Sequence, residues 1–191
     1  MTGGAQDSDA DLVHRALDGD ERAYSLLMKR HKDGLYRFAR RYSGNGDDAL
    51  EIVQLTFISA WQALRRFETG RAFDVWLRAI ALNKCRDMGR RRKVRHFITA
   101  LGQLPDNLAD PPTMQAGPEA VLLDREALRQ ADAAIAALPH GLKAPLLLTA
   151  LEGLTMAEAG AVLGMSAKAV ENRLYRARKA LAAATTRHTG D

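Results

Sequence analysis

The sequence predicts an all-α protein with two small helical domains joined by a proline-rich linker, the second domain containing a helix-turn-helix. Apolar residues recur every three or four positions through most of the 191-residue chain, and almost no segment alternates apolar and polar residues. Four of the six prolines lie between Gly102 and Pro118, where they disfavour helix. We therefore expect domains over 1–98 and 119–191, separated by a semi-rigid linker over 99–118.

Helical periodicity places four helices before the linker, with short connections that are typical of an antiparallel bundle. They are expected over 11–17, 21–42, 47–67 and 72–95. The apolar side chains expected in their core are Tyr24, Leu27, Met28, Leu35, Phe38, Ile52, Val53, Phe57, Ile58, Trp61, Leu64, Leu77, Ile80 and Ala81. After the linker, two helices over 119–138 and 142–151 precede the helix-turn-helix, which makes a second four-helix unit.

The helix-turn-helix spans residues 154–181, and particular residues specify its turn. Thr155 and Glu158 have the three-residue spacing of a capping box, which begins the first helix. Gly164 can adopt the left-handed conformation that ends that helix, and Ser166 is a good N-cap for the second. Two capped helices around a tight glycine turn predict DNA binding.

The second helix of the motif has one apolar face and one polar, mostly basic face. The apolar positions, spaced by four, three and four residues, are Val170, Leu174, Ala177 and Leu181. The polar side chains are of the types that read base edges in the major groove or bind phosphate. The residues expected to contact duplex DNA are Lys168, Glu171, Asn172, Arg173, Tyr175, Arg176 and Arg178, with Lys179 beside them. A merely solvated face is the alternative for an isolated basic helix, but the capped pair of helices favours DNA.

A second basic segment, which we call the basic arm, comprises residues 86–95 at the end of the fourth helix. Six of its ten residues are Lys or Arg, against the single acid Asp87. Such side chains release condensed counterions when they bind DNA phosphates, which gives strong and salt-dependent binding. Upstream, Phe67 and Trp76 flank the loop 68–72, where an aromatic ring can stack on a single-stranded base. We expect Phe67 in the core, whereas a core position and a DNA-facing position are equally compatible with Trp76.

Composition excludes several other kinds of protein. The net charge of +5 and a sequence pI near 9.6 fit a polyanionic partner. The single cysteine, Cys85, excludes an internal disulfide and a multi-thiolate zinc site, and the five histidines lack metal-ligand spacing. Asp47, Asp48 and Glu51 resemble paired catalytic acids, but they begin a helix, where carboxylates oppose the macrodipole. We therefore expect no catalytic residue, metal or cofactor. Because the chain has no signal peptide and no apolar run that could span a bilayer, we expect it in the cytoplasm.

Taken as a set, these segments resemble the extracytoplasmic-function sigma factors, which keep only the second and fourth conserved regions of bacterial sigma factors. The segments that carry the resemblance are Asp11–Val13 with Gly19–Asp20, Asp48–Ala49, Gln54–Phe57, Ala60–Trp61, Trp76–Leu77, Ile80–Asn83 with Asp87, and Leu154–Leu181. The proline linker stands in place of the missing third region. Such proteins are non-catalytic subunits that direct RNA polymerase core to specific promoters and assist promoter melting.

The resemblance implies a role for each surface. The third helix would bind the clamp helices of the polymerase β′ subunit through Asp48, Glu51, Gln54 and Phe57, and the polymerase β flap would be a further contact. The loop 68–72 and the fourth helix would capture a flipped base of the minus-ten element. The residues expected to contact this element are Trp76, Asn83, Arg86, Arg90 and Arg91, with Asn83 reading the base. The helix-turn-helix would read the minus-thirty-five element as duplex.

Two departures from the family pattern limit what the resemblance carries over. Leu50 and Leu55 stand where acids are common, so binding to the clamp would be either weaker or partly apolar. Glu171 stands where an arginine often precedes the base-reading residues, so the promoter sequence does not carry over. The segment 83–97 also resembles a subgroup that includes regulators of heavy-metal resistance. Because family members are usually held inactive by an anti-sigma factor, often membrane-bound, we expect such a partner here.

The main alternative is a stand-alone transcriptional regulator that uses the same DNA-binding domain. Its N-terminal bundle would then be a sensor or a dimerisation module. Such a regulator binds its duplex operator tightly by itself, whereas a sigma factor is expected to bind weakly without core polymerase. The residues alone are compatible with both.

Overall fold

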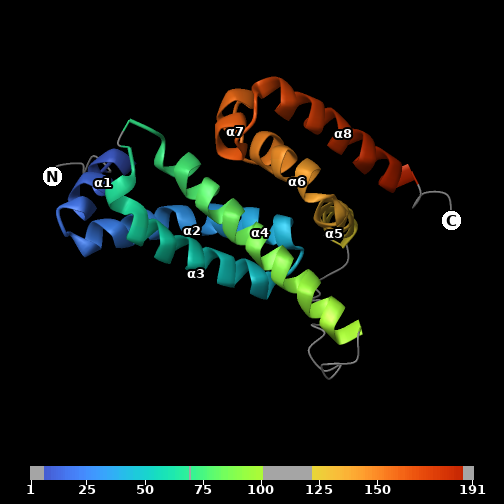
Figure 1. The fold of residues 1–191 in the computed structure, drawn as a ribbon, viewed down its shortest axis with the longest axis horizontal. Coiled ribbons are helices and arrows are strands. Elements are labelled where there is room, and N and C mark those ends of the chain that lie inside the picture. Colours follow the sequence, from blue (N-terminus) through green and yellow to red (C-terminus); the bar gives the residue numbers. More distant parts are fainter. Residues whose placement is uncertain (1–6, 69, 101–121, 187–191) are drawn as a thin grey trace.

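The computed structural model describes residues 7–68, 70–100 and 122–186, and every regular element in these ranges is helical (Figure 1). The all-α prediction is therefore confirmed. In chain order the elements are α1 (Asp9–Leu17), α2 (Glu21–Ser43), α3 (Gly46–Ala63), a 3-10 turn η1 (Leu64–Arg66), α4 (Phe73–Ala100), α5 (Leu122–Ala137), α6 (His140–Leu146), a π-helical turn η4 (Leu147–Leu151), α7 (Met156–Leu163) and α8 (Ala167–Thr186). The expected linker, 99–118, lies outside the described residues except for its first two positions, which continue α4.

Capping side chains set the breaks between the first helices. Ser8 and Asp11 form a capping box at the start of α1, and the Asp20 carboxylate accepts two backbone N–H groups at the start of α2. Gly44, with φ of 76°, ends α2 in the left-handed conformation. Asn45 then caps α3 by accepting two backbone N–H groups of its first turn. The chain therefore reverses within two residues, and α2 and α3 pack as neighbours.

The core of the N-terminal half lies around α2, which packs against α1, α3 and α4. Leu12, Leu27, Phe38, Ile52 and Leu77 come from these four helices and are almost completely buried. Each such side chain contributes about 1.5–3 kcal/mol when it leaves water. The predicted bundle is thus held together mainly by apolar packing on one central helix.

Three side chains predicted for this core lie on the surface instead. Met28, Ile58 and Trp61 are 37%, 55% and 42% exposed, so the prediction was wrong for them. Helical periodicity marks the apolar side of a helix but not whether a neighbour covers it. The apolar faces of α2 and α3 are wider than their mutual contact, and these three side chains border the groove that remains.

Two helix ends also differ from the expected bounds. The third helix leaves the α-helical conformation after Ala63 and closes with the 3-10 turn η1. The fourth runs to Ala100, five residues beyond its expected end. Lys and Arg residues are good helix formers, so the basic arm continues the helix beyond its last buried turn.

The C-terminal helices pack directly on the N-terminal bundle. α7 contacts α4 and α5 contacts α2, whereas α8 lies on the outer side of the molecule (Figure 1). Leu147 and Val170 belong to the same buried cluster as Leu12 of the first helix. The two helical units are therefore in contact, and they share one apolar core.

Lys143 ties the two units together with a buried charge. Its side chain is only 8% exposed, and its Nζ donates to the backbone oxygen of Tyr42 at 3.0 Å and to that of Ala136. The ammonium also lies 5.0 Å from the centroid of the Tyr42 ring. Burial lowers the pKa of Lys143. Hydrogen bonds to two carbonyls compensate the lost hydration, and they bridge α2, α5 and α6.

The helix-turn-helix forms as the sequence predicts. Thr155 Oγ1 accepts from the N–H of Glu158 at 3.2 Å, and the Glu158 carboxylate accepts from the N–H of Thr155 at 2.8 Å. Gly164 has a φ of 68°, and Ser166 Oγ accepts from the N–H of Ala169 at 3.2 Å. All three predicted capping residues are confirmed in their roles.

The turn also depends on a close approach at Gly160, which the sequence did not reveal. A Cβ at this position would lie 2.6 Å from the carbonyl oxygen of Met165, an atom of the turn backbone. We predict that Gly160→Ala lowers the free energy of unfolding by about 1–3 kcal/mol, because the turn must shift to admit a methyl group. Thermal unfolding followed by circular dichroism measures the effect.

Gly141→Ala is the matched control. A Cβ at Gly141, which lies in α6, meets no heavy atom closer than 4.0 Å. Alanine favours helix over glycine, so this variant should be neutral or slightly stabilised. Equal melting temperatures for the two variants would contradict the account of the turn.

Candidate functional site

The outer face of α8 presents most of the side chains that the sequence assigns to duplex DNA. Val170, Leu174 and Ala177 are buried beneath it, while Leu181 is half-buried. The assigned residues that are exposed are Lys168, Glu171, Asn172, Tyr175, Arg176 and Arg178. α8 thus carries a wide polar surface on a rigid apolar base.

Two of the assigned side chains have other neighbours. Arg173 is half-buried, and its guanidinium lies beside Gly141 at the start of α6. Lys168 Nζ forms an ion pair with the Glu171 carboxylate at 2.7 Å, one turn along the helix. This exposed pair partly neutralises the first turns of α8, so the net positive charge lies farther along, around Arg176.

The aromatic side chains beside the loop 68–72 form one cluster. The rings of Phe67, Phe73 and Trp76 contact one another, with centroids 5.0 to 5.7 Å apart. Phe67 is buried, as predicted, and Trp76 is half-buried. A cavity of about 330 Å³, lined in part by Phe67, Phe73 and Arg71, opens next to this cluster. The two phenylalanine rings that line the cavity are buried, and the half-buried Trp76 ring that packs on both offers an aromatic surface on which a flipped base can stack.

Trp76, Asn83 and Arg90 lie on one stripe of α4, because they are separated by seven residues each time. Trp76 is half-buried, and Asn83 and Arg90 are exposed. Arg86 lies next to this stripe, and its Nη1 donates to Asn83 Oδ1 at 3.4 Å. Along the stripe, the Trp76 ring is followed by the Asn83 amide and then by the Arg90 guanidinium. This order fits a DNA base that stacks on the ring and contacts the amide, with its phosphate backbone at the guanidinium.

Each of the four arginines from 86 to 92 has a partner within the protein. Arg90 pairs with Asp87 on α4 itself, and Arg91 approaches Glu51 of α3 at 4.0 Å. Arg92 forms an ion pair with Asp48 of α3 at 3.0 Å, and Arg86 Nε donates to a ring nitrogen of His140. The basic arm is thus partly neutralised before any DNA binds.

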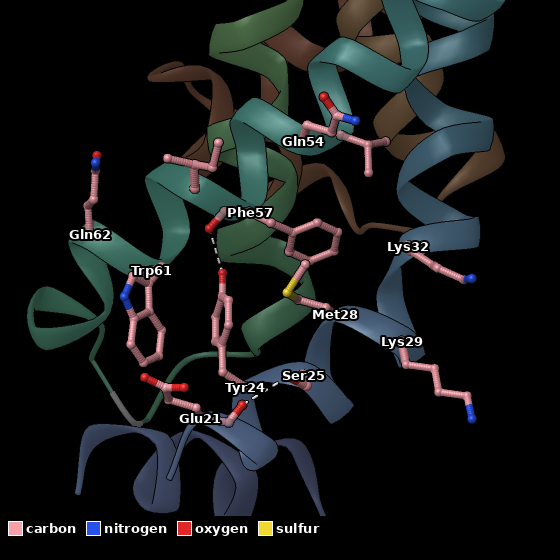
Figure 2. Close-up of a pocket in the computed structure, with 12 residues that line it drawn as sticks. Glu21, Tyr24, Ser25, Met28, Lys29, Lys32, Gln54, Phe57, Trp61 and Gln62 are labelled. Carbon is pink, nitrogen blue, oxygen red and sulfur yellow. Dashed lines mark hydrogen bonds between the residues drawn. The ribbon is translucent and has the colours of Figure 1, made fainter. Parts of the chain in front are cut away.

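An open hollow lies between α2 and α3 (Figure 2). It measures about 710 Å³ and is lined mainly by apolar side chains, among them Met28, Phe57, Ile58 and Trp61. Figure 2 shows Tyr24 at its floor, where the hydroxyl donates to the Phe57 carbonyl at 2.6 Å. Burial raises the pKa of Tyr24, so it remains a neutral donor at ordinary pH.

The structure separates the four residues that the sequence assigns to polymerase binding. Gln54 and Phe57 line the groove. Glu51 is exposed one turn earlier in α3, and the Asp48 carboxylate lies near the helix start against Arg92. Two of the four therefore belong to the groove, and two face the basic arm.

Polar contacts of α2 and α4 with the C-terminal unit were not expected from the sequence. Arg78 Nε forms an ion pair with Glu152 at 2.5 Å, and both side chains are largely buried. His140 contacts the Tyr42 hydroxyl through Nδ1 and accepts from Arg86 through Nε2. No local pattern marks these residues, because each pair joins positions at least fifty residues apart. These contacts hold the C-terminal unit against α2 and α4.

The described residues give no indication of a metal site or a membrane span. No group of three His, Cys, Asp or Glu side chains among them is arranged to hold a metal ion. None of the described helices is both long and apolar enough to cross a bilayer. Cys85 is buried, and burial raises the pKa of its thiol to about 12.

Comparison with known proteins identifies the family. Residues 27–95 match the family model described as Sigma-70 region 2, and residues 128–181 match the model described as Sigma-70, region 4. RNA polymerase sigma factor CnrH of Cupriavidus metallidurans is 39% identical over 180 residues, which cover 93% of this chain and 94% of the relative. ECF RNA polymerase sigma factor SigE of Mycolicibacterium smegmatis is 32% identical over 91% of this chain and 66% of its own length. The chain belongs to the extracytoplasmic-function sigma factors. A solved structure of CnrH in complex with the cytosolic domain of CnrY has a TM-score of 0.67 to this sigma factor, with 33% identity, and covers 93% of this chain and 96% of that one.

Family membership decides between the two functions that the sequence left open. This sigma factor is a transcription initiation factor that directs bacterial RNA polymerase core to promoters, and the stand-alone regulator is set aside. The expected resemblance to the subgroup that includes regulators of heavy-metal resistance is confirmed by the similarity to CnrH.

The contact between the two units should weaken in acid because of His140. Burial lowers the pKa of His140, and the charges of Lys143 and Arg173 lower it further. Since the folded-state pKa lies below 6.5, neutral His140 contributes fully above that pH. We predict that the contribution is lost as pH falls from there through the lowered pKa, since a protonated ring can no longer accept from Arg86. Energy transfer between dyes attached to α1 and α8 measures the separation.

His140→Gln supplies the comparison for this prediction. Glutamine keeps a side-chain oxygen that can accept from Arg86, but it does not titrate. Its pH profile should be flat where that of the unsubstituted protein falls. Identical profiles for the two proteins would show that His140 does not control the contact.

Proposed function

We propose that this sigma factor uses three separate surfaces to start transcription. The exposed face of α8 reads the minus-thirty-five duplex, the loop 68–72 with α4 captures the minus-ten element, and the α2–α3 groove binds the clamp helices of polymerase. The observation that carries the proposal is that two exposed basic surfaces occur on different helices, α4 and α8. A bipartite promoter requires that separation.

The minus-ten assignment is supported by the stripe on α4. A base that leaves the duplex costs a few kcal/mol to unstack, and stacking on an aromatic ring returns about 1–3 kcal/mol. Trp76 offers the ring, and Asn83 offers an amide two turns later that can read the base edge. Arg86, Arg90 and Arg91 then hold the adjacent backbone.

The geometry of a promoter implies that the two units separate on DNA. The elements centred near minus ten and minus thirty-five are roughly 25 base pairs apart, which is about 85 Å along the duplex. α4 has 28 residues and is about 42 Å long. While α7 packs against α4, the two DNA-reading surfaces are too close to reach both elements. The contacts made by Glu152 and His140 therefore break when the promoter is bound.

The groove is the surface that best fits a protein partner. It is apolar and open, and Leu50 extends the exposed apolar residues of α3 toward the helix start. Apolar patches of this kind are typical of protein interfaces. Because CnrH was solved with the cytosolic domain of CnrY, and another fold relative with an anti-sigma factor, we propose that an inhibitor competes with polymerase for this groove.

The C-terminal unit is assigned to the polymerase β flap. The sigma factor is assigned to the cytoplasm, where polymerase works.

Promoter-dependent transcription tests the proposed function. The purified sigma factor with core polymerase from its own host should initiate at a discrete set of promoters. We predict that Asn83→Ala reduces open-complex formation about tenfold, which corresponds to one lost base contact, and leaves core binding unchanged. Arg176→Ala should instead weaken binding to the minus-thirty-five duplex. Failure of the unsubstituted protein to support initiation with that core would overturn the assignment.

Substitution in the groove tests the polymerase surface. We predict that Ile58→Glu weakens binding to core at least tenfold, because it places a charge where an apolar side chain is buried on binding. Leu26→Glu is the matched control, since Leu26 is a comparably exposed apolar residue of α2 that does not line the groove. Fluorescence anisotropy with labelled sigma factor measures both affinities. Equal losses for the two variants would place the polymerase contact elsewhere.

A further inference from the structure

Beyond Met88, the direction of the basic arm is not fixed by the packing of buried apolar side chains. Met88 is the last buried side chain of α4 among the described residues. Gly89 follows it inside the helix, where glycine costs about 1 kcal/mol relative to alanine. The helix therefore has a weak point just before the arginines that are assigned to the DNA backbone. Some other contact must hold the arm in place.

Asp48 of α3 provides that contact. The side chain is only 14% exposed, and the guanidinium of Arg92 lies 3.0 Å from its Oδ2. Oδ2 is completely buried and makes no hydrogen bond with any described group, so the charge of Arg92 is its main compensation. The backbone N–H of Asp48 donates to Asn45 Oδ1, which fixes this residue in the first turn of α3. A rigid helix end thus holds the arm by one ion pair.

The neighbouring ion pair, between Arg91 and Glu51, is more exposed and more widely spaced than the pair between Arg92 and Asp48. Arg91 and Glu51 are both more than half exposed and lie 4.0 Å apart. Such a pair contributes little and exchanges readily for another partner. Breaking the less exposed pair leaves an uncompensated carboxylate, which costs more. Arg91 is therefore free to turn to a phosphate, whereas Arg92 stays with Asp48.

We propose that Asp48 is a positioning residue for the basic arm, acting through Arg92, and not a direct contact with polymerase. The ion pair aligns the stripe of α4 so that Arg90 and Arg91 meet the DNA backbone beside the captured base. This inference rests on the proposed minus-ten role of α4. It replaces the role that the family resemblance implies for Asp48, which is binding to the polymerase clamp helices.

The test uses the full chain assembled with core polymerase and a fluorescein-labelled single-stranded DNA that carries the minus-ten element of a mapped promoter. Asp48→Asn and Arg92→Gln should each weaken binding of this DNA about fivefold. The double variant should lose no more than either single one, because both remove the same interaction. Affinity for core should stay within about twofold. Asp47→Asn is the matched control, since Asp47 is the exposed residue next to Asp48, and it should leave DNA affinity unchanged.

Gly89→Ala distinguishes positioning from a general loss of stability. A Cβ at Gly89 meets no atom within 4 Å, so the methyl group fits without strain. Because alanine stiffens the helix, it should recover a large part of the DNA affinity that Asp48→Asn loses. If Asp48→Asn lowers the melting temperature, Arg92→Gln, which changes the more exposed member of the pair, provides the same comparison.

Two results would overturn the inference. One is unchanged DNA affinity in both single variants, and the other is a loss of core affinity in Asp48→Asn as large as that in Ile58→Glu. An Arg90→Gln, Arg91→Gln variant separates this inference from the proposed function. If that variant binds the single-stranded DNA normally, the minus-ten assignment of α4 fails; if it binds weakly while Asp48→Asn binds normally, only the positioning role fails.

Discussion

Helix α2 is the element on which both halves of this sigma factor depend. It packs against α1, α3 and α4, and it also contacts α5 and η4 from the C-terminal unit. A helix with so many neighbours must be apolar on several sides at once, and Tyr42 illustrates the result. Its ring is buried, its hydroxyl contacts His140, and its carbonyl accepts from Lys143. Where no element covers α2, its apolar surface becomes the groove.

Most of the fold was predictable because its signals are local. The capping residues Thr155, Gly164 and Ser166 act within a few positions of themselves, so their spacing alone defines the helix-turn-helix. The exposed apolar residues were not predictable in the same way. Ile58 and Trp61 have the spacing of core residues, and only the missing neighbour distinguishes them. Lys143 is the opposite case. Its position among leucines indicates no partner, yet its buried ammonium donates to the carbonyl of Ala136, seven positions away, and to that of Tyr42, 101 positions away.

The DNA-reading surfaces also combine features that local sequence patterns predict with contacts that they do not predict. Periodicity correctly placed most of the α8 residues outward and missed only the inward turn of Arg173. Two ion pairs of the basic arm, Arg91 with Glu51 and Arg92 with Asp48, join residues about forty positions apart, and no spacing rule identifies them. Replacing an exposed pair such as Arg91–Glu51 by a phosphate changes the direct electrostatic energy little. The affinity of the arm for DNA therefore derives mainly from released counterions, which makes it strongly dependent on salt.

The two tryptophans of this sigma factor lie at two different binding surfaces, so the fluorescence of each can report on one of them. Trp61 borders the groove, with its ring 4.7 Å from that of Tyr24, and Trp76 lies in the aromatic cluster beside the loop 68–72. The chain contains only these two. An indole emits at shorter wavelength when its surroundings lose water, so occupancy of the groove and capture of a base each alter a different emitter. Replacing either one by phenylalanine would leave a single-site probe, with which the order of polymerase binding and strand capture can be followed in real time without an attached dye.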